Sequence, residues 1–549
     1  MRTLSGAAPV ALLFTPPARF AVMTMGVLSM SVAQVKAVAA VIEAKSTGLI
    51  DISAAIASAH EGDTIAVPAG TANWTSTLTI TKGITLMGAG DDKTVFLDDV
   101  ARTPLNKGGA ILIAELNPKQ SFRLTGITFR AGSLAARGNN GAVRIKGTCP
   151  AVRIDHCHFD GLHQLCVHTY GCIFGVIDHC VFDCARGSLS ILVWHDAWGG
   201  KFYGDGSWAE PPYFGSEKFL FIEDNTFKNL GKKQTNGNID AKNGARYVAR
   251  NNNFYNCMPN SHGTEGGAQT GVRAVEIYNN RFHWTFHSSG GQLRSGTAVI
   301  HDNISDGAAP AYAKVLQQYR IVTNDVPLGP ANGSNAWDLN DTEGNGTNVP
   351  GHRPFIYATG TASQSAPLSL TVSPSPNWTA NQWTNCEVTN LDQQKNHGYP
   401  MSSYIISNTS DTIRFARTSQ GTNLAFNSGN KFQIHKLLIS MDQPGRGKRD
   451  VIRNSRGLTG SPRWPNQVSE PVYGWNNNHV DSNKISSPLY VRSIGPTLQE
   501  NRDFCNNTPL PGYKPYTYPH PLVSGVSSST GNAGEKRPET SEATSSSNN

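Results

Sequence analysis

The fold of this chain is decided by the stretch VARNNNF at residues 248–254, which returns as EIYNNRF at residues 276–282. Both copies place alternating apolar residues before a polar residue, and an aromatic residue follows two positions later. Further copies lie at 152–159, 176–182 and 221–227, with weaker ones at 124–129 and 300–303. The polar positions are 126, 157, 180, 225, 252, 280 and 303. All of their separations fall in the range of roughly 20–50 residues that is typical of solenoid repeats.

The repeat predicts one coil of a solenoid per copy. Each coil adds parallel strands about 4.8 Å above the previous ones, so equivalent side chains stack in columns. An inward column of asparagines bonds the buried backbone of the turns, and the aromatic residue fills the interior. Cys157 and Cys180 occupy the asparagine column in their coils, either as stacked thiols or as a disulfide. We therefore predict an all-β, right-handed parallel β-helix.

Composition supports an all-β chain and argues against several classes of protein. Of 549 residues, 16% are charged and 54 are glycine, whereas soluble domains usually carry about 25% charged residues. Heptads and long amphipathic helices are missing, which argues against coiled coils and helix bundles. The net charge of +7 is mild and no Lys/Arg block occurs, which argues against nucleic-acid binding and suits an acidic polymer.

The chain divides into five predicted parts. Residues 1–39 read as a signal peptide, because Arg2 and Arg19 precede an apolar run and AVA at 37–39 offers a cleavage site. An uncleaved membrane anchor is the alternative; no other stretch is apolar enough to span a bilayer. The chain is thus expected to be secreted, where its nine cysteines can form disulfides. The remaining parts are a cap with coils (40–304), an inserted β-rich module (305–435), last coils with a second cap (436–523) and a disordered tail (524–549).

The cap region carries a resemblance to a known fold family. A short helical segment at 52–59 is followed by strand-like segments at 64–71 and 78–90. This string resembles the start of right-handed parallel β-helix proteins of the pectin-lyase type. The resemblance extends through the repeats to about residue 304.

Period-two alternation selects the candidate site residues, because alternate side chains of a strand point outward. In the coil of Asn252 the outward set is Asn238, Asp240 and Lys242. Counted back from the column position, His168 and Asp240 share one position, and Tyr170 and Lys242 share another. Later coils add His262, Glu265, Gln292 and Arg294 to the same predicted face, and the excess residues after Cys180 add Trp194 and Trp198.

These residue types suit β-elimination, which removes a proton alpha to a carboxylate. The reaction needs a base, an acid for the leaving oxygen, and a cation or Ca²⁺ that neutralises the carboxylate. The order Asp240-Ala241-Lys242, an asparagine strand, then His262-Gly263 is similar to alginate lyases and chondroitinase B. The resemblance implies that Lys242 is the base and that Asn and Glu residues bind Ca²⁺. In that family an Arg before the His-Gly pair is the acid, but this chain has Ser261 there, so Arg294 or His262 takes that role. The segment 294–303 separately resembles a pectate lyase strand.

The prediction is therefore a polysaccharide lyase that cleaves a uronate polymer as a monomer. Its catalytic residues would be Lys242, Arg294 and His262, and its Ca²⁺ or neutralising cluster Asn238, Asp240 and Glu265. Substrate would contact His168, Tyr170, Trp194, Trp198 and Gln292, the aromatic rings stacking on sugar C–H faces. Two alternatives stay open: a glycoside hydrolase that pairs Asp240 with Glu265, and a non-catalytic surface or adhesin-like β-helix that only binds glycans.

Overall fold

The structure, a computed structural model, describes residues 38–101, 109–134, 142–162, 165–183, 189–200, 204–229, 238–263, 271–286, 290–308, 313–316, 356–384, 386–394, 400–417, 424–436, 444–447, 468–480, 489–491 and 498–525. The predicted signal peptide, apart from residues 38–39, and the predicted tail beyond residue 525 lie outside these ranges. Within them, no helix has both the length and the apolar character needed to cross a membrane.

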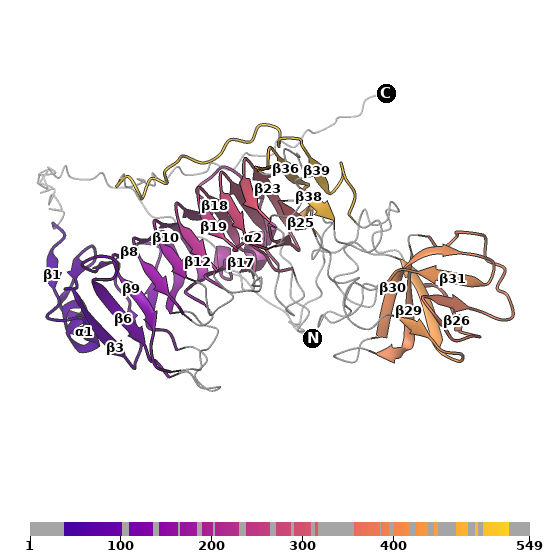
Figure 1. Ribbon diagram of the computed structural model, residues 1–549, viewed down its shortest axis with the longest axis horizontal. Coiled ribbons are helices and arrows are strands. Elements are labelled where there is room, and N and C mark those ends of the chain that lie inside the picture. The colour runs from indigo at the N-terminus through magenta and orange to yellow at the C-terminus, as the bar shows by residue number, and fades with distance from the viewer. Residues whose placement is uncertain are drawn as a thin grey trace, which may run out of the picture. The chain divides into compact units, whose positions relative to one another are not determined.

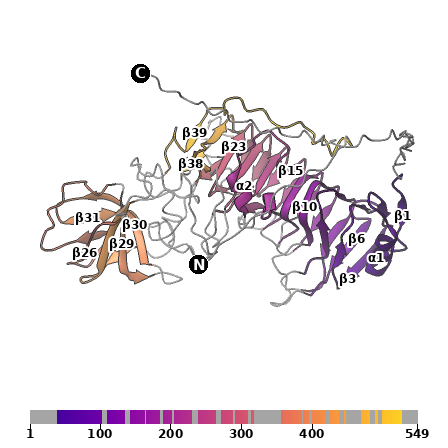
Figure 2. The same ribbon diagram turned by 180° about the vertical axis from the view of Figure 1, so that it is seen from behind.

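Successive coils pair in parallel to form three faces, and the predicted all-β parallel β-helix is confirmed (Figures 1 and 2). The first face holds β4 (Leu78–Ile80), β7 (Leu112–Leu116), the first parts of β10 (Val143–Asp155) and β12 (Val167–Asp178), β14 (Ile191–Trp194) and β17 (Ile239–Lys242). A smaller sheet continues this series of strands with β22 (Gln292–Leu293), β25 (Lys314–Leu316) and β38 (Leu489–Val491).

The other two faces run the length of the solenoid. The second face holds β1 (Val41–Glu43), β2 (Thr64–Ala66), β5 (Thr85–Met87), β8 (Ser121–Thr125), the later parts of β10 and β12, β15 (Leu220–Glu223), β18 (Arg246–Arg250), β20 (Ala274–Tyr278), β23 (Thr297–His301), β36 (Val472–Trp475) and β39 (Phe504–Asn506). The third face holds β3 (Gly70–Trp74), β6 (Thr94–Asp98), β9 (Thr128–Ala131), β11 (His158–Asp160), β13 (Val181–Asp183), β16 (Thr226–Lys228), β19 (Asn253–Tyr255), β21 (Arg281–Trp284), β24 (Ile304–Gly307) and β37 (Asn478–His479).

An asparagine ladder forms the turn between the second and third faces. The side-chain Nδ2 of Asn225, Asn252, Asn280 and Asn303 each donates to the Oδ1 of the next rung, at 3.1, 3.0, 2.9 and 2.8 Å. The last acceptor is Asn477, which lies 174 residues beyond Asn303 in the chain and was missed by the repeat count. The residue before each rung has positive φ, between 48° and 57°, which turns the chain while the amide satisfies the buried backbone.

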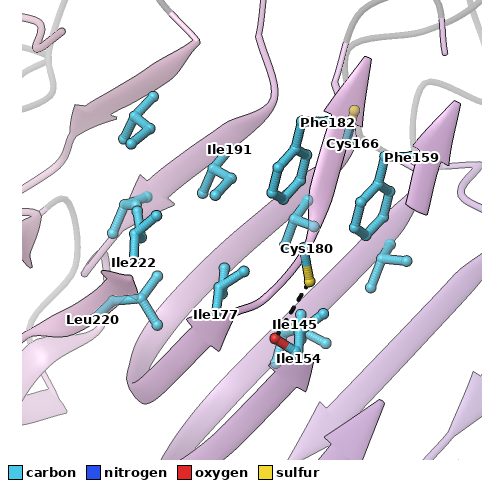
Figure 3. Packing of buried hydrophobic residues seen from close by; sticks show 14 of the residues in the cluster. Ile145, Ile154, Phe159, Cys166, Ile177, Cys180, Phe182, Ile191, Leu220 and Ile222 are labelled. Atoms are coloured by element: carbon cyan, nitrogen blue, oxygen red, sulfur yellow. Dashed lines mark hydrogen bonds between the residues drawn. The ribbon is translucent and has the colours of Figure 1, made fainter. Parts of the chain in front are cut away.

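Earlier coils build the same turn without asparagine. Thr125 pairs with Asp155, so Gly126 corresponds to His156, and both have positive φ. The column residue of that coil is therefore Ile127, and its assignment to position 126 was wrong by one residue. Cys157 and Cys180 are free thiols, as are all the other cysteines in the described ranges. The Cys180 thiol donates to the carbonyl of Ile154 at 3.6 Å (Figure 3).

The interior is filled by the aromatic column that the repeat predicted. Rings of Phe159, Phe182, Phe227, Phe254 and Phe282 stack with centroids 4.8 Å apart and nearly parallel planes. Isoleucines of the first and second faces, such as Ile145, Ile177 and Ile222, pack beside this column (Figure 3). At the N-terminal end α1 (Leu49–Ser58) buries Ile52, Ala55 and Ile56, and so caps the core as expected.

The excursions of the later coils leave the solenoid at one corner, between the first and second faces. Residues 195–219, with η1 (Trp198–Gly200) and α2 (Asp205–Ala209), connect β14 to β15, and 263–273 lead into β20. The largest excursion connects β25 to β36. Because β24 and β25 still belong to the coils, this insertion begins after Leu316 rather than at 305. Within it β34 (Arg446–Gly447) pairs with β35 (Val468–Ser469).

The inserted module has a core of its own. Its six-stranded antiparallel sheet has the order β26 (Ile356–Thr361), β33 (Lys431–Lys436), β29 (Cys386–Gln394), β30 (Pro400–Asn408), β31 (Thr412–Phe415) and β28 (Ser369–Thr371). A hairpin of β27 (Ala366–Pro367) and β32 (Ala425–Phe426) accompanies it. Val388, Ile405 and Phe432 are among its buried residues.

A C-terminal strap, defined here as residues 513–523, covers part of the second face. The hydroxyl of Tyr513 donates to Glu276 at 2.5 Å, and Arg250 donates to the carbonyls of Tyr516 and Thr517. Further along, Arg153 donates to the carbonyl of Leu522 at 3.1 Å. The strap thus runs back across the coils from β20 to β10 and covers the charged residues of these strands.

Candidate functional site

The first face brings the predicted residues of different coils into register. Arg144 pairs with His168, His168 with Leu192, and Leu192 with Asp240. One pleat further on, Lys146, Tyr170, Trp194 and Lys242 follow one another in the same way. The expected alignments of His168 with Asp240 and of Tyr170 with Lys242 are therefore correct, with β14 between them.

Asp240 and His262 form a hydrogen-bonded pair at the C-terminal end of this row. A parallel bridge joins Ile239 to Pro259, and the His262 N–H donates to the carbonyl of Ala241 at 2.8 Å, which carries the register into the next coil. The Nε2 of His262 lies 2.7 Å from Oδ2 of Asp240. The Asp240 side chain is 4% exposed, whereas that of His262 is 34% exposed. A buried carboxylate thus orients an accessible imidazole, the arrangement that suits a general acid or base.

Aromatic and cationic groups lie beside this pair. The Lys242 ammonium sits 4.7 Å from the ring centroid of Trp194, and the Arg144 guanidinium lies 5.0 Å from that of Tyr170. Such distances give favourable cation–π contacts. Trp194 and Tyr170 are half-buried, with centroids 5.4 Å apart. This part of the face therefore combines ring surfaces with positive charge.

His168 lies beneath these groups. Its ring is 4.7 Å from that of Trp194 in an edge-to-face arrangement, and the residue is almost fully buried. Burial, followed by the charges of Arg144 and Lys242, lowers the pKa of His168 to about 3. The imidazole is consequently neutral at physiological pH.

Asp196, which sequence reasoning missed, reaches the row from the excursion after β14. Its Oδ1 accepts a hydrogen bond from Asn243 Nδ2 at 2.8 Å. Burial raises the pKa of Asp196, opposed by hydrogen bonds from Tyr170 and Asn243 and by the charge of Lys242. Asp196 thereby fixes the Tyr170 hydroxyl and the turn after Lys242.

The predicted residues of the later coils that the structure describes are buried or half-buried. Arg294 is 7% exposed and its Nε donates to the carbonyl of Ser261 at 2.8 Å, which supports the His262 loop. The backbone N–H of Gln292 donates to Asn260 Oδ1 at 2.7 Å. Lys314, one coil later, is buried, and burial lowers its pKa to about 7 against the opposing charge of Asp240. Gln292 is half-buried beside this group.

The predicted Ca²⁺ cluster does not fit the donor atoms that are described. Asn238 is fully buried and its Oδ1 accepts from the Met258 N–H at 3.2 Å. Both oxygens of Asp240 are engaged, Oδ1 with the Ala241 N–H and Oδ2 with His262. Glu265 lies outside the described residues. Because Ca²⁺ takes six to eight oxygen ligands, we derive no step through a metal here.

A separate group of possible ligands, Asp91, Asp92 and His158, lies near the N-terminal coils. There Arg130 already pairs with Asp92 at 2.8 Å. We therefore assign no metal to this group.

Trp198 is placed differently from the expectation. Its ring is 5% exposed and packs against Phe174, His195 and the guanidinium of Arg246. It therefore offers little free surface to a sugar, and Tyr170 and Trp194 are the partly exposed rings of the row. Asp155–His156 and Asp178–His179 form hydrogen-bonded pairs at the turn, where both histidines have positive φ, so these pairs shape the turn.

Comparisons with known proteins give little beyond this geometry. No family model matches the chain, and no curated protein matches it. Among solved structures, the chain is similar to ORF18 of Geobacillus virus E2, at 13% identity and TM-score 0.23, with 77% of this chain and 80% of that chain covered. It is similar to the tailspike protein of E. coli bacteriophage HK620, solved in complex with a pentasaccharide, at 11% identity and TM-score 0.24, covering 68% and 87%. The tailspike gp61 of Pseudomonas phage phi297 matches at 9% identity and TM-score 0.18, covering 70% and 90%. Likenesses this weak carry no argument, so the proposals below rest on the chain's own residues.

Proposed function

We propose that this protein is a secreted polysaccharide lyase that cleaves a uronate-containing polymer by β-elimination on its first face. The observation that carries the proposal is the Asp240–His262 pair next to Lys242, on a face where the rings of Tyr170 and Trp194 lie between cations. A lyase of this kind also agrees with the pectin-lyase-like and alginate-lyase-like patterns of the sequence.

The contacts favour a division of roles that differs from the sequence expectation. Lys242 lies over the Trp194 ring, a contact that favours its charged form. We therefore assign Lys242 to neutralising the substrate carboxylate, and the base to His262. Asp240 is a positioning residue, because it holds the imidazole and stabilises the imidazolium that forms.

In the proposed step His262 takes the proton from the carbon alpha to the carboxylate. The electron pair of that C–H bond forms the new carbon–carbon double bond, and the bond to the glycosidic oxygen breaks. The imidazolium then gives its proton to the leaving oxygen, so one residue acts as base and acid. His262 is favoured over Arg294 for the second transfer because Arg294 is buried and bound to the Ser261 carbonyl.

The two alternatives fit the described contacts less well. A hydrolase that pairs Asp240 with Glu265 would need Asp240 free, and its Oδ2 is bound to His262. A pure binder gives no role to a buried carboxylate that orients an accessible imidazole beside a cation. Both remain outcomes of the experiment below.

The test is turnover of a panel of polymers, namely polygalacturonate, alginate, hyaluronan and chondroitin sulfate. A lyase produces ultraviolet absorbance from the unsaturated uronate, whereas a hydrolase produces reducing ends without it. His262→Ala should lower the rate by about 10²–10⁴-fold, the usual worth of a general acid–base group. Lys242→Arg should retain measurable activity because it keeps the cation, while Lys242→Ala should not.

The matched control is His283→Ala. His283 also pairs with an aspartate, Asp306, but lies on the third face. Equal losses in His262→Ala and His283→Ala would refute the assignment, as would unchanged turnover in His262→Ala. Polymer retention without any product would instead support the glycan binder.

A further inference from the structure

Four buried polar atoms without partners lie together on the first face. They are Nε of Arg144, both ring nitrogens of His168, and Nε1 of Trp194, and none has a hydrogen-bond partner in the described part of the chain. Their strands, β10, β12 and β14, are direct neighbours. Because nearly all buried polar atoms in proteins are paired, such a concentration calls for an explanation.

The chemistry of the three side chains is complementary to that of an acidic sugar. Neutral His168 offers one donor and one acceptor, as a hydroxyl group requires, and a sugar reaches it only when the Trp194 ring packed against it turns aside. The Arg144 guanidinium presents donors in the planar geometry that matches a carboxylate. Tyr170 and Trp194 add ring surfaces on which the C–H face of a sugar packs.

We propose that Arg144, His168 and Trp194, on the three strands that precede the strand of Asp240, form a second subsite, which binds an anionic sugar of the polymer beside the Asp240–His262 pair. The inference rests on the proposed function, because the subsite is placed relative to the sugar that reacts at the Asp240–His262 pair. The polymer then lies across the strands, parallel to the solenoid axis. Arg144 and Asp240 are in register, so three strand spacings, about 14 Å, separate Arg144 from the acid–base pair, whereas Trp194 lies on the strand next to that of Asp240.

The ligand class follows from the charge of the site and of the chain. Arg144 and Lys242 are cations at its two ends, and Asp196, the carboxylate next to it, is bound to Asn243. A net charge of +7 without a basic block suits an acidic glycan better than a nucleic acid. We therefore commit to a carboxylated or sulfated glycan, with the nucleic acid as an outcome of the test.

The experiment measures binding of polygalacturonate and alginate oligosaccharides by calorimetry, with neutral dextran and single-stranded DNA for comparison. Arg144→Gln and His168→Phe should each weaken binding of at least one acidic oligosaccharide by about tenfold or more, since each removes a hydrogen bond to a charged or buried group. The control is Lys146→Gln, two residues from Arg144 on the same strand, whose side chain already pairs with Glu115. It should change affinity less than about twofold.

Thermal unfolding separates this role from a structural one. His168→Phe keeps an aromatic ring and removes two unpaired buried nitrogens, so its melting temperature should equal or exceed that of the parent while its binding weakens. A lower melting temperature with unchanged affinity would overturn the inference. Equal losses in Arg144→Gln and Lys146→Gln, or tighter binding of DNA than of any glycan, would overturn it too. Arg144-dependent binding without turnover would sustain the subsite while refuting the lyase.

Discussion

Replacing Asn252 by leucine is expected to destabilise the middle of the solenoid severely. Asn252 is 1% exposed, and its Nδ2 donates to the carbonyls of Ile222 and Arg250 and to Oδ1 of Asn280. Its Oδ1 accepts from the N–H and the Nδ2 of Asn225, at 3.0 and 3.1 Å. Leucine keeps the volume and removes all five bonds.

The magnitude follows from the groups left behind. The buried N–H of Asn225 loses its acceptor, which costs about 1–3 kcal/mol, and each other bond contributes about 0.5–1.5 kcal/mol. Because the five bonds share groups, we expect a total loss of about 3–6 kcal/mol rather than the full sum. The cost should fall on the coils of β15, β18 and β20, because coils of a solenoid interact only with their neighbours.

The assay is urea unfolding followed by circular dichroism, with hydrogen exchange of the amides of Asn225 and Asn280 as the local readout. The matched control is Asn253→Leu, the next residue, which is exposed and lies outside the ladder. It should cost less than about 0.5 kcal/mol. A loss below about 1 kcal/mol in Asn252→Leu, or equal losses in both variants, would refute the view that the ladder holds the turns.

Two further predictions concern pH and metal. Burial raises the pKa of Glu276 to about 7, against hydrogen bonds from Tyr513 and the Gly215 N–H. Because the folded pKa lies above the ordinary 4.5, its stabilising effect is complete below pH 4.5 and is lost as the pH rises through 7. The melting temperature should therefore fall over that window, and Glu276→Gln should flatten this part of the profile; an unchanged slope would contradict the argument. Chelation with EDTA should leave turnover and glycan affinity unaltered, since the oxygens of Asp240 are already bound; a loss that Ca²⁺ restores would count against this account.

The sequence predicted the fold well because the ladder and the aromatic column repeat in every regular coil. Counting back from a rung also predicted the alignment of His168 with Asp240, since both coils have the same number of residues between the first face and the turn. The same count fails where a coil is irregular. A bulge between Cys149 and Val152 in β10 shifts Arg144 by one position relative to its neighbours.

Two features of the site could not be predicted from the sequence: the alignment of strands that are followed by an excursion, and the burial of outward-facing side chains. Residues 195–219 separate β14 from its rung at Asn225, so the alignment of Trp194 with Lys242 had no sequence signal. Alternation places Asn238 and Arg294 on the outward side of their strands, but neighbouring coils cover both. Whether an outward side chain meets solvent or another coil depends on those coils, and local periodicity does not encode it.

The strap has a consequence for how the molecule is made. Arg153 and Leu522, which share a hydrogen bond, are 369 residues apart in the chain. Synthesis proceeds at about 5–20 residues per second, and N-terminal regions fold first. The second face of the early coils therefore stays uncovered for tens of seconds after its synthesis. During that time Phe221 and the charged residues beside it are exposed to water. A chain that ends before residue 513 would contain the coils of the solenoid but no strap over their second face.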